Sequence, residues 1–190
     1  MKVNLRLPLL LITLQAPLCL SATELTVNFT ATVKETTCAM GVSALSGSAV
    51  SGDAASGNYY LDFPTMGVAD ITQKSALTEA SFKVTPTNCN NDISSIKMTI
   101  NGNRSGESNT LLINDNASSA DASGIGVGFK RRGEDDNSRF TLDGSTYVDW
   151  TTDEIAQGME LTGIIRQLNA ANDISPGAFQ AKATFVFNYN

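Results

Sequence analysis

Residues Ser175–Asn190 read SPGAFQAKATFVFNYN, and this stretch decides the fold that we expect. Pro176 and Gly177 form a turn signal, after which apolar and polar residues alternate to the end of the sequence. Such alternation is typical of a β-strand with one buried face. The apolar face of the predicted strand is Ala181, Ala183, Phe185, Phe187 and Tyr189. A strand that comes last has an exposed edge unless another segment pairs with it.

A second alternating segment lies near the other end of the sequence. Its apolar residues are Leu25, Val27, Phe29, Ala31 and Val33, and polar residues such as Asn28 and Thr30 lie between them. The sequence therefore predicts two strongly patterned end segments around a globular middle. This arrangement suits subunits that complete one another.

Residues 1–22 are predicted to be a signal peptide. Lys2 and Arg6 are basic, Leu7–Leu14 is apolar, and Ser21 and Ala22 are small. The apolar run is too short for a membrane-spanning helix, and Pro8 lies within it and Pro17 shortly after it. Removal of 22 residues from the 190-residue chain leaves 168, which is one ordinary domain with an extension.

Composition excludes several classes of function. The formal net charge is −6, which argues against nucleic acid and against an electrostatic membrane partner. The chain has no histidine, so it lacks the commonest general base and the commonest metal ligand. Paired acids occur at Asp135–Asp136 and Asp153–Glu154, but both pairs lie among polar residues and are interpreted as solvated surface. We expect no catalytic site, no metal and no cofactor.

Two cysteines, Cys38 and Cys89, remain after the signal peptide. In an exported chain an even pair favours a disulfide. The alternative is a pair of buried free thiols.

Two aromatic residues, Trp150 and Tyr147, could stack on a sugar. We favour the interpretation that they lie in the core or at its rim.

The middle of the chain reads as many short strands separated by turns rich in glycine, asparagine, aspartate and serine. We expect loops over Ser43–Gly57 and Asn114–Gly124, a charged hairpin tip over Arg131–Arg139, and short helices only near Ala69–Ala80 and Thr152–Gln157. The expected strands are Ser95–Ile100, Thr110–Ile113, Ile125–Phe129, Phe140–Leu142, Tyr147–Trp150 and Met159–Leu168. This spacing indicates an all-β sandwich.

Four features together resemble the pilin subunits of chaperone–usher fimbriae, particularly the type 1-like fimbrial proteins. Gly177 is fourteenth from the end and Tyr189 is penultimate, with alternating apolar residues between them. Cys38 follows the alternating extension, and Cys89 ends the alternating segment Phe82–Cys89. Pro86 falls where the family usually has an apolar strand residue, so we expect a bulge or an edge there.

The resemblance implies an incomplete immunoglobulin-like β-sandwich, which a donor strand from another subunit completes. Its domains would be the signal peptide 1–22, the donor-strand extension 23–37 and the pilin domain 38–190. The implied donor side chains are Leu25, Val27, Phe29, Ala31 and Val33. The implied acceptor groove, also the chaperone-binding strand, comprises Gly177, Ala181, Ala183, Phe185, Phe187 and Tyr189. Ala31 stands in the slot that is usually glycine, and this leaves the donor register open.

The implied partners are neighbouring pilin subunits, a periplasmic chaperone and an outer-membrane usher. The implied function is that of a non-enzymatic structural subunit of a fimbrium on the cell surface, exported through the periplasm and supporting adhesion. The alternative is a minor tip or adaptor subunit with its own carbohydrate-binding role.

Overall fold

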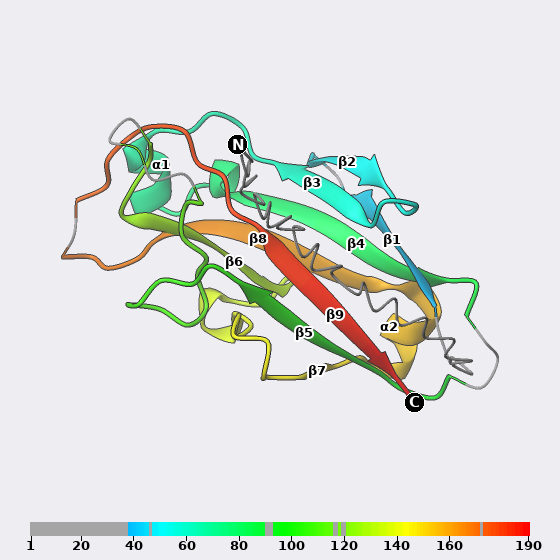
Figure 1. The fold of residues 1–190 in the computed structure, drawn as a ribbon. Helices are drawn as coiled ribbons and strands as arrows, with labels where there is room; N and C mark the ends of the chain where they lie inside the picture. Colours follow the sequence, from blue (N-terminus) through cyan, green and yellow to red (C-terminus); the bar gives the residue numbers. More distant parts are fainter. Residues whose placement is uncertain (1–37, 46, 90–92, 116–117, 119–120, 172) are drawn as a thin grey trace, which may run out of the picture. The chain divides into compact units, whose positions relative to one another are not determined.

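The computed structural model describes residues 38–190 except 46, 90–92, 116–117, 119–120 and 172. Two antiparallel sheets form a sandwich (Figure 1). One sheet has the strand order β1-β4-β8-β6, formed by Ala39–Ala44, Glu79–Thr87, Met159–Gln167 and Ile125–Arg131. The other has the order β7-β5-β9, formed by Val148–Asp149, Ile96–Gly102 and Ala183–Tyr189. A separate hairpin joins β2 and β3, formed by Ala49–Asp53 and Asn58–Asp62. The expectation of an all-β sandwich is therefore confirmed.

The core lies between the two sheets. Its fully buried side chains come from both sheets and from the loops beside them, and include Met98, Ile100, Leu112, Leu142, Met159 and Leu161. Strand β8 is central, because it pairs with β4 on one side and with β6 on the other. Burial of so many apolar side chains is the main stabilising contribution to such a domain.

The helices are short. The segment α2, Thr152–Gln157, is predicted correctly and begins with a capping box: the Glu154 N–H donates to the Thr151 hydroxyl at 3.2 Å, and the Thr151 N–H donates to the Glu154 carboxylate at 2.8 Å. The helix predicted near Ala69–Ala80 is shorter than expected and is divided into α1, Val68–Thr72, and the 3₁₀ helix η1, Ala76–Thr78. A further 3₁₀ helix, η2, spans Asp136–Ser138.

Some expectations for the middle of the chain are wrong. The interval Ser43–Gly57 is not one loop, because β1 continues to Ala44 and β2 begins at Ala49. The intervals Thr110–Ile113 and Phe140–Leu142 are not strands. Within these two intervals, only Leu112 forms isolated bridges, one with Val127 of β6 and one with Arg104. These segments have strand-like sequences, but isolated backbone hydrogen bonds hold them in place of a continuous ladder.

The glycines of β6 explain this bridge. A Cβ on Gly126 would lie 2.8 Å from the Leu112 carbonyl oxygen, and one on Gly128 would lie 2.7 Å from the Thr110 carbonyl oxygen. The backbone of residues 110–112 can therefore approach β6 only because these positions carry no side chain.

The register explains how β4 accommodates Pro86. Pairing of β4 with β8 ends at Val84, whereas pairing with β1 continues to Ala39↔Thr87. Pro86 lies in the part of β4 that is paired on one side, so the expectation of an edge position is confirmed.

Candidate functional site: the apolar edge of β9 and β1

Strand β9 is paired along one side. It pairs with β5 from Ile96↔Tyr189 to Gly102↔Ala183, and no other described strand pairs with it. Its burial alternates residue by residue, as the sequence predicts. The inward-facing side chains, however, are half-buried: Ala183, Phe185, Phe187 and Tyr189. An edge strand with an apolar face of this kind is a template for pairing with another segment.

The inward side chains of β9 pack on the core. The Phe185 ring centroid lies 5.3 Å from that of Phe129 and 6.4 Å from that of Phe82, in edge-to-face arrangements. The Phe187 ring lies 6.0 Å from the indole of Trp150. Edge-to-face pairs at these distances are favourable beyond their burial. The row therefore belongs to the core although part of its surface stays accessible.

Strand β1, at one edge of the other sheet, also carries half-buried apolar side chains. Strand β1 pairs only with β4 among the described strands, and its half-buried Met40 and Val42 pack against the same core cluster. The β2–β3 hairpin adds Val50 and Leu61 to this cluster. We call the half-buried rows of β1 and β9 the apolar edge; its members are Met40, Val42, Ala183, Phe185, Phe187 and Tyr189.

The two strands are tied together where β9 ends and β1 begins. The Tyr189 hydroxyl donates to the Cys38 carbonyl at 3.3 Å, and burial raises the pKa of Tyr189. Cys38 forms the predicted disulfide with Cys89, with the two Cα atoms 4.2 Å apart. On the other side of β1, the Tyr59 hydroxyl donates to the Met40 carbonyl at 3.4 Å. The apolar edge thus has one end fixed by a hydrogen bond and a covalent cross-link.

The structure brings most of the predicted acceptor residues together, with two differences. Ala181 precedes the first residue of β9, so the strand is shorter than the predicted Ala181–Tyr189, although Ala181 still packs on the core. Gly177 is exposed and lies outside β9. The predicted signal peptide and the donor residues Leu25, Val27, Phe29, Ala31 and Val33 lie outside the described residues.

A cluster of ion pairs was not expected from the sequence. Asp136 was interpreted as a solvated surface acid, yet its side chain is 16% exposed and its Oδ2 lies 2.6 Å from Nε of Arg166. Hydrogen bonds from Arg166 lower the pKa of Asp136 well below its usual value, against the opposing effect of burial. Burial alone would lower the pKa of Arg166, but hydrogen bonds to Asp136 and Glu79 raise it overall. One signal in the sequence could have indicated this cluster. Arg166 is a charged residue among positions of β8 whose side chains are buried.

Glu154, a member of the other acid pair, is paired as well. Its carboxylate accepts from the guanidinium of Arg131 at 2.7 Å. Burial alone would raise the pKa of Glu154, but the hydrogen bonds from Arg131 and from the Thr151 N–H lower it overall. Neither Asp136 nor Glu154 is therefore the free surface acid that the sequence suggested.

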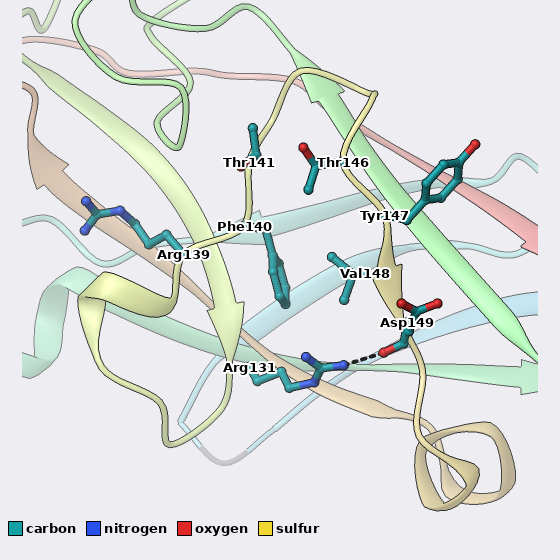
Figure 2. Close-up of a pocket in the computed structure, with 8 residues that line it drawn as sticks. All are labelled: Arg131, Arg139, Phe140, Thr141, Thr146, Tyr147, Val148 and Asp149. Atoms are coloured by element: carbon teal, nitrogen blue, oxygen red, sulfur yellow. Dashed lines mark hydrogen bonds between the residues drawn. The ribbon is translucent and has the colours of Figure 1, made fainter.

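A hollow of about 400 Å³ lies beside β7 (Figure 2). Phe140 and Val148 line it, and the Arg131 guanidinium at its side donates to the Asp149 carbonyl at 2.7 Å. The Tyr147 side chain points away from Phe140, and its ring contacts Lys97 instead, with Nζ 5.9 Å from the centroid. Trp150 is buried in the core, as the default interpretation expected. Arg131, Arg139 and Asp149 bring charged groups to this hollow beside the two aromatic residues Phe140 and Tyr147.

The described residues include no group of three acids or cysteines that could hold a metal ion. Within the same part of the chain, no helix has the length and apolar character needed to cross a membrane.

Comparison with solved structures supports the class of fold. The crystal structure of the P pilus rod subunit PapA matches with a TM-score of 0.55 and 16% identity, over 87% of this chain and 99% of that one. The fold is therefore that of an immunoglobulin-like pilin domain. Comparison of sequences gives the family. Residues 27–190 match the model of the fimbrial protein family, and this chain belongs to that family.

A curated relative supports this assignment. The uncharacterized fimbrial-like protein YadM of Escherichia coli strain K12 is 38% identical over 171 residues, which cover 88% of each chain. Membership implies other pilin subunits as partners and a fimbria on the cell surface as the location.

Proposed function

We propose that the protein is a structural, non-enzymatic fimbrial subunit that polymerises by donor-strand exchange. The observation that carries the proposal is strand β9, whose inward row of apolar side chains is half-buried and whose second edge is unpaired among the described strands. The space between β9 and β1 would be the acceptor groove. A donor strand there would add main-chain hydrogen bonds along β9 and apolar side chains above the core.

The donor would be residues 23–37 of a neighbouring copy or of another pilin. Leu25, Val27, Phe29, Ala31 and Val33 would face the core, and the polar residues between them would face solvent. Five inward residues of the donor match five apolar positions from Ala181 to Tyr189. Side chains alternate between the two faces in both strands, so a shift of the donor by one residue would turn all its apolar side chains toward solvent. The donor register can therefore change only by an even number of residues.

A periplasmic chaperone would occupy the groove first, and an outer-membrane usher would then exchange its strand for the donor. Residues 1–22 would direct export to the periplasm. The need for a temporary occupant follows from the apolar edge, because an exposed edge strand with an apolar face invites aggregation. The fimbria would support adhesion of the cell.

The test uses a mature subunit that lacks residues 23–37, purified with its chaperone, and a peptide of residues 23–37. The chain has a single tryptophan, Trp150, and its indole packs on Phe187 of β9, so its fluorescence reports occupancy of the groove. We expect the peptide to displace the chaperone, to change the Trp150 emission and to raise the midpoint of thermal unfolding.

Two variant peptides give matched controls. Phe29→Asp places a charge on the inward face and is expected to abolish binding, whereas Thr30→Asp places the same charge on the adjacent outward position and is expected to bind. Equal binding of both variants would contradict the assigned donor face. A truncated subunit that folds alone into a stable, cooperative monomer would contradict the proposal as a whole.

A further inference from the structure

The segment before β9 continues the inward row of that strand. Pairing of β9 with β5 begins at Ala183, yet the alternation of half-buried and exposed residues begins earlier, at Phe179. Phe179 and Ala181 pack on the core, whereas the residues that alternate with them are exposed. We call residues 178–182 the strap. The apolar row of β9 therefore extends over the strap to Phe179.

The loop between β5 and β6 holds the strap where β5 no longer pairs with the chain. The Ala122 N–H donates to the Ala178 carbonyl at 2.9 Å, and the Asp115 N–H donates to the Gln180 carbonyl at 2.7 Å. Both carbonyls belong to even-numbered residues. The loop therefore takes the place that β5 has along β9.

Asn114 completes this attachment with its side chain. Its amide nitrogen donates to the Ala178 carbonyl at 2.7 Å and to the Ala122 carbonyl at 3.0 Å, and its amide oxygen accepts from the Gln180 N–H at 3.1 Å. An asparagine amide has two donor hydrogens and one acceptor oxygen, so one side chain serves all three backbone groups. Asn114 thus fixes the backbone of the strap to the loop.

This attachment leaves the second edge of the strap unpaired. In an extended chain, the N–H and C=O of one residue point to one side and those of the next residue to the other side. Even-numbered residues pair with the loop along the strap and with β5 beyond the far end of β9, where Asn190 and Ser95 exchange backbone hydrogen bonds of 3.1 and 2.9 Å. Odd-numbered residues therefore direct their backbone groups toward the second edge. Among the described residues, none forms a backbone hydrogen bond with Phe179 or Ala181.

We propose that Asn114 is a positioning residue for donor binding, because it holds the strap as an extension of the acceptor groove. The proposal rests on donor-strand exchange. A donor strand that runs antiparallel to β9, as neighbours in an immunoglobulin-like sandwich do, places its Val33 nearest the start of β9. Five inward donor residues fit the six inward positions from Phe179 to Tyr189 in two registers. Val33 lies opposite Phe179 in one register and opposite Ala181 in the other, so both registers place Val33 on the strap.

A donor on the strap would gain the two kinds of contact that it gains along β9. Its main chain would bond to the unpaired backbone groups of Phe179 and Ala181, and Val33 would cover apolar side chains that pack on the core. Without the Asn114 amide, the strap would lose three of the hydrogen bonds that fix it, and donor binding would have to order it. The resulting loss should fall on the Val33 end of the donor alone.

The test uses the full mature chain with Phe29→Asp in its own extension, purified with its chaperone, so that subunits cannot fill one another's grooves. Binding of a peptide of residues 23–37 is followed by chaperone release and by tryptophan fluorescence. Asn114→Ala is expected to weaken this binding roughly tenfold. Asn103→Ala is the matched control, because its amide bonds to a side chain of the loop at 3.3 Å and not to the strap. For this control we expect a change of less than about twofold.

A double-mutant cycle separates positioning from a general effect on the fold. On the parent subunit, Val33→Ala in the peptide should weaken binding roughly five- to tenfold, and on the Asn114→Ala subunit it should cost less than about twofold. The cost of Val27→Ala, nearer the other end of the donor, should be the same on both subunits. If Asn114 only stabilised the fold, the costs of both peptide changes would be the same on the two subunits.

A shortened peptide tests the strap without any change in the groove. A peptide of residues 23–32 lacks Val33 and should bind the parent subunit at least about tenfold more weakly than residues 23–37. Equal binding of the two peptides, or an equal cost of Val33→Ala with and without the Asn114 amide, would overturn the role of Asn114 while donor binding stands. Failure of the 23–37 peptide to bind the parent subunit would instead remove donor-strand exchange itself.

Discussion

Strands β8 and β9 both carry large apolar residues but have very different surroundings. Both alternate in part, both carry large apolar residues, and both face the same core. Strand β8 is paired on both sides, and Met159, Leu161 and Ile164 are fully buried. Strand β9 is paired on one side among the described strands, and its inward residues are half-buried. The difference in burial follows from the number of neighbours rather than from the residues themselves.

The comparison distinguishes a strand that the described domain covers completely from one that it covers only in part. The outer face of β8 is covered by the ion cluster around Arg166 and by the helices that contribute to it. The apolar face of β9 packs on the core but is only half-buried, and no described strand lies along its second edge. The alternating sequence of β9 predicts a buried apolar face, yet this face is only half-buried. This difference is the structural basis of the proposed donor-strand exchange.

The largest effect is expected for a cavity in β8. Leu161 is 0% exposed, so Leu161→Ala should reduce the free energy of unfolding by about 2–5 kcal/mol. Urea unfolding of the subunit bound to the donor peptide measures this loss, with wild type in the same complex as the reference. A loss no larger than that of a surface substitution would mean that Leu161 does not lie in a close-packed core.

An intermediate effect is expected for the ion cluster on the outer side of β8. Asp136→Asn leaves the buried Arg166 without its main anionic partner and should destabilise the domain by roughly 2 kcal/mol near neutral pH. The adjacent Asp135→Asn is the matched control, because asparagine can still accept the hydrogen bond from Asn137 N–H that begins η2.

The pH dependence of this effect has a defined sign. The folded-state pKa of Asp136 lies below the ordinary value of 3.8, so its contribution to stability is fully present above that value. The contribution is lost as the pH falls below about 4 and the carboxylate becomes protonated. The difference in the free energy of unfolding between wild type and Asp136→Asn should therefore decrease in acid. A difference that stays constant down to pH 2 would show that the charge of Asp136 is not what stabilises Arg166.

The sequence was sufficient for the fold class and for the alternation of β9, because both depend on local periodicity. Phe185, Phe187 and Tyr189 face inward as their spacing predicts. The sequence was also sufficient for α2, because the capping box from Thr151 to Glu154 is a local signal.

The ion cluster was not predictable in this way. Asp136, Arg166 and Glu79 lie far apart in the sequence and meet only because η2, β8 and the start of β4 pack together. The hairpin β2–β3 was missed for another reason: Ala49–Asp53 is small and polar and has the composition of a loop. Its pairing with the more apolar Asn58–Asp62 forms the strand, and such pairing is set by tertiary context.

The smallest effect is expected on the outer face of β9. Val186 is 45% exposed and lies opposite Thr99 of β5, while its neighbour Phe185 faces the core. Val186→Ala should change the free energy of unfolding by less than about 0.5 kcal/mol, because a partly exposed side chain away from special features contributes little. Phe185→Ala, the matched comparison one residue away, should cost more and should also weaken donor binding. Equal losses for the two variants in urea unfolding of the donor-peptide complex would mean that β9 is covered on both faces, and the distinction between β8 and β9 would then disappear.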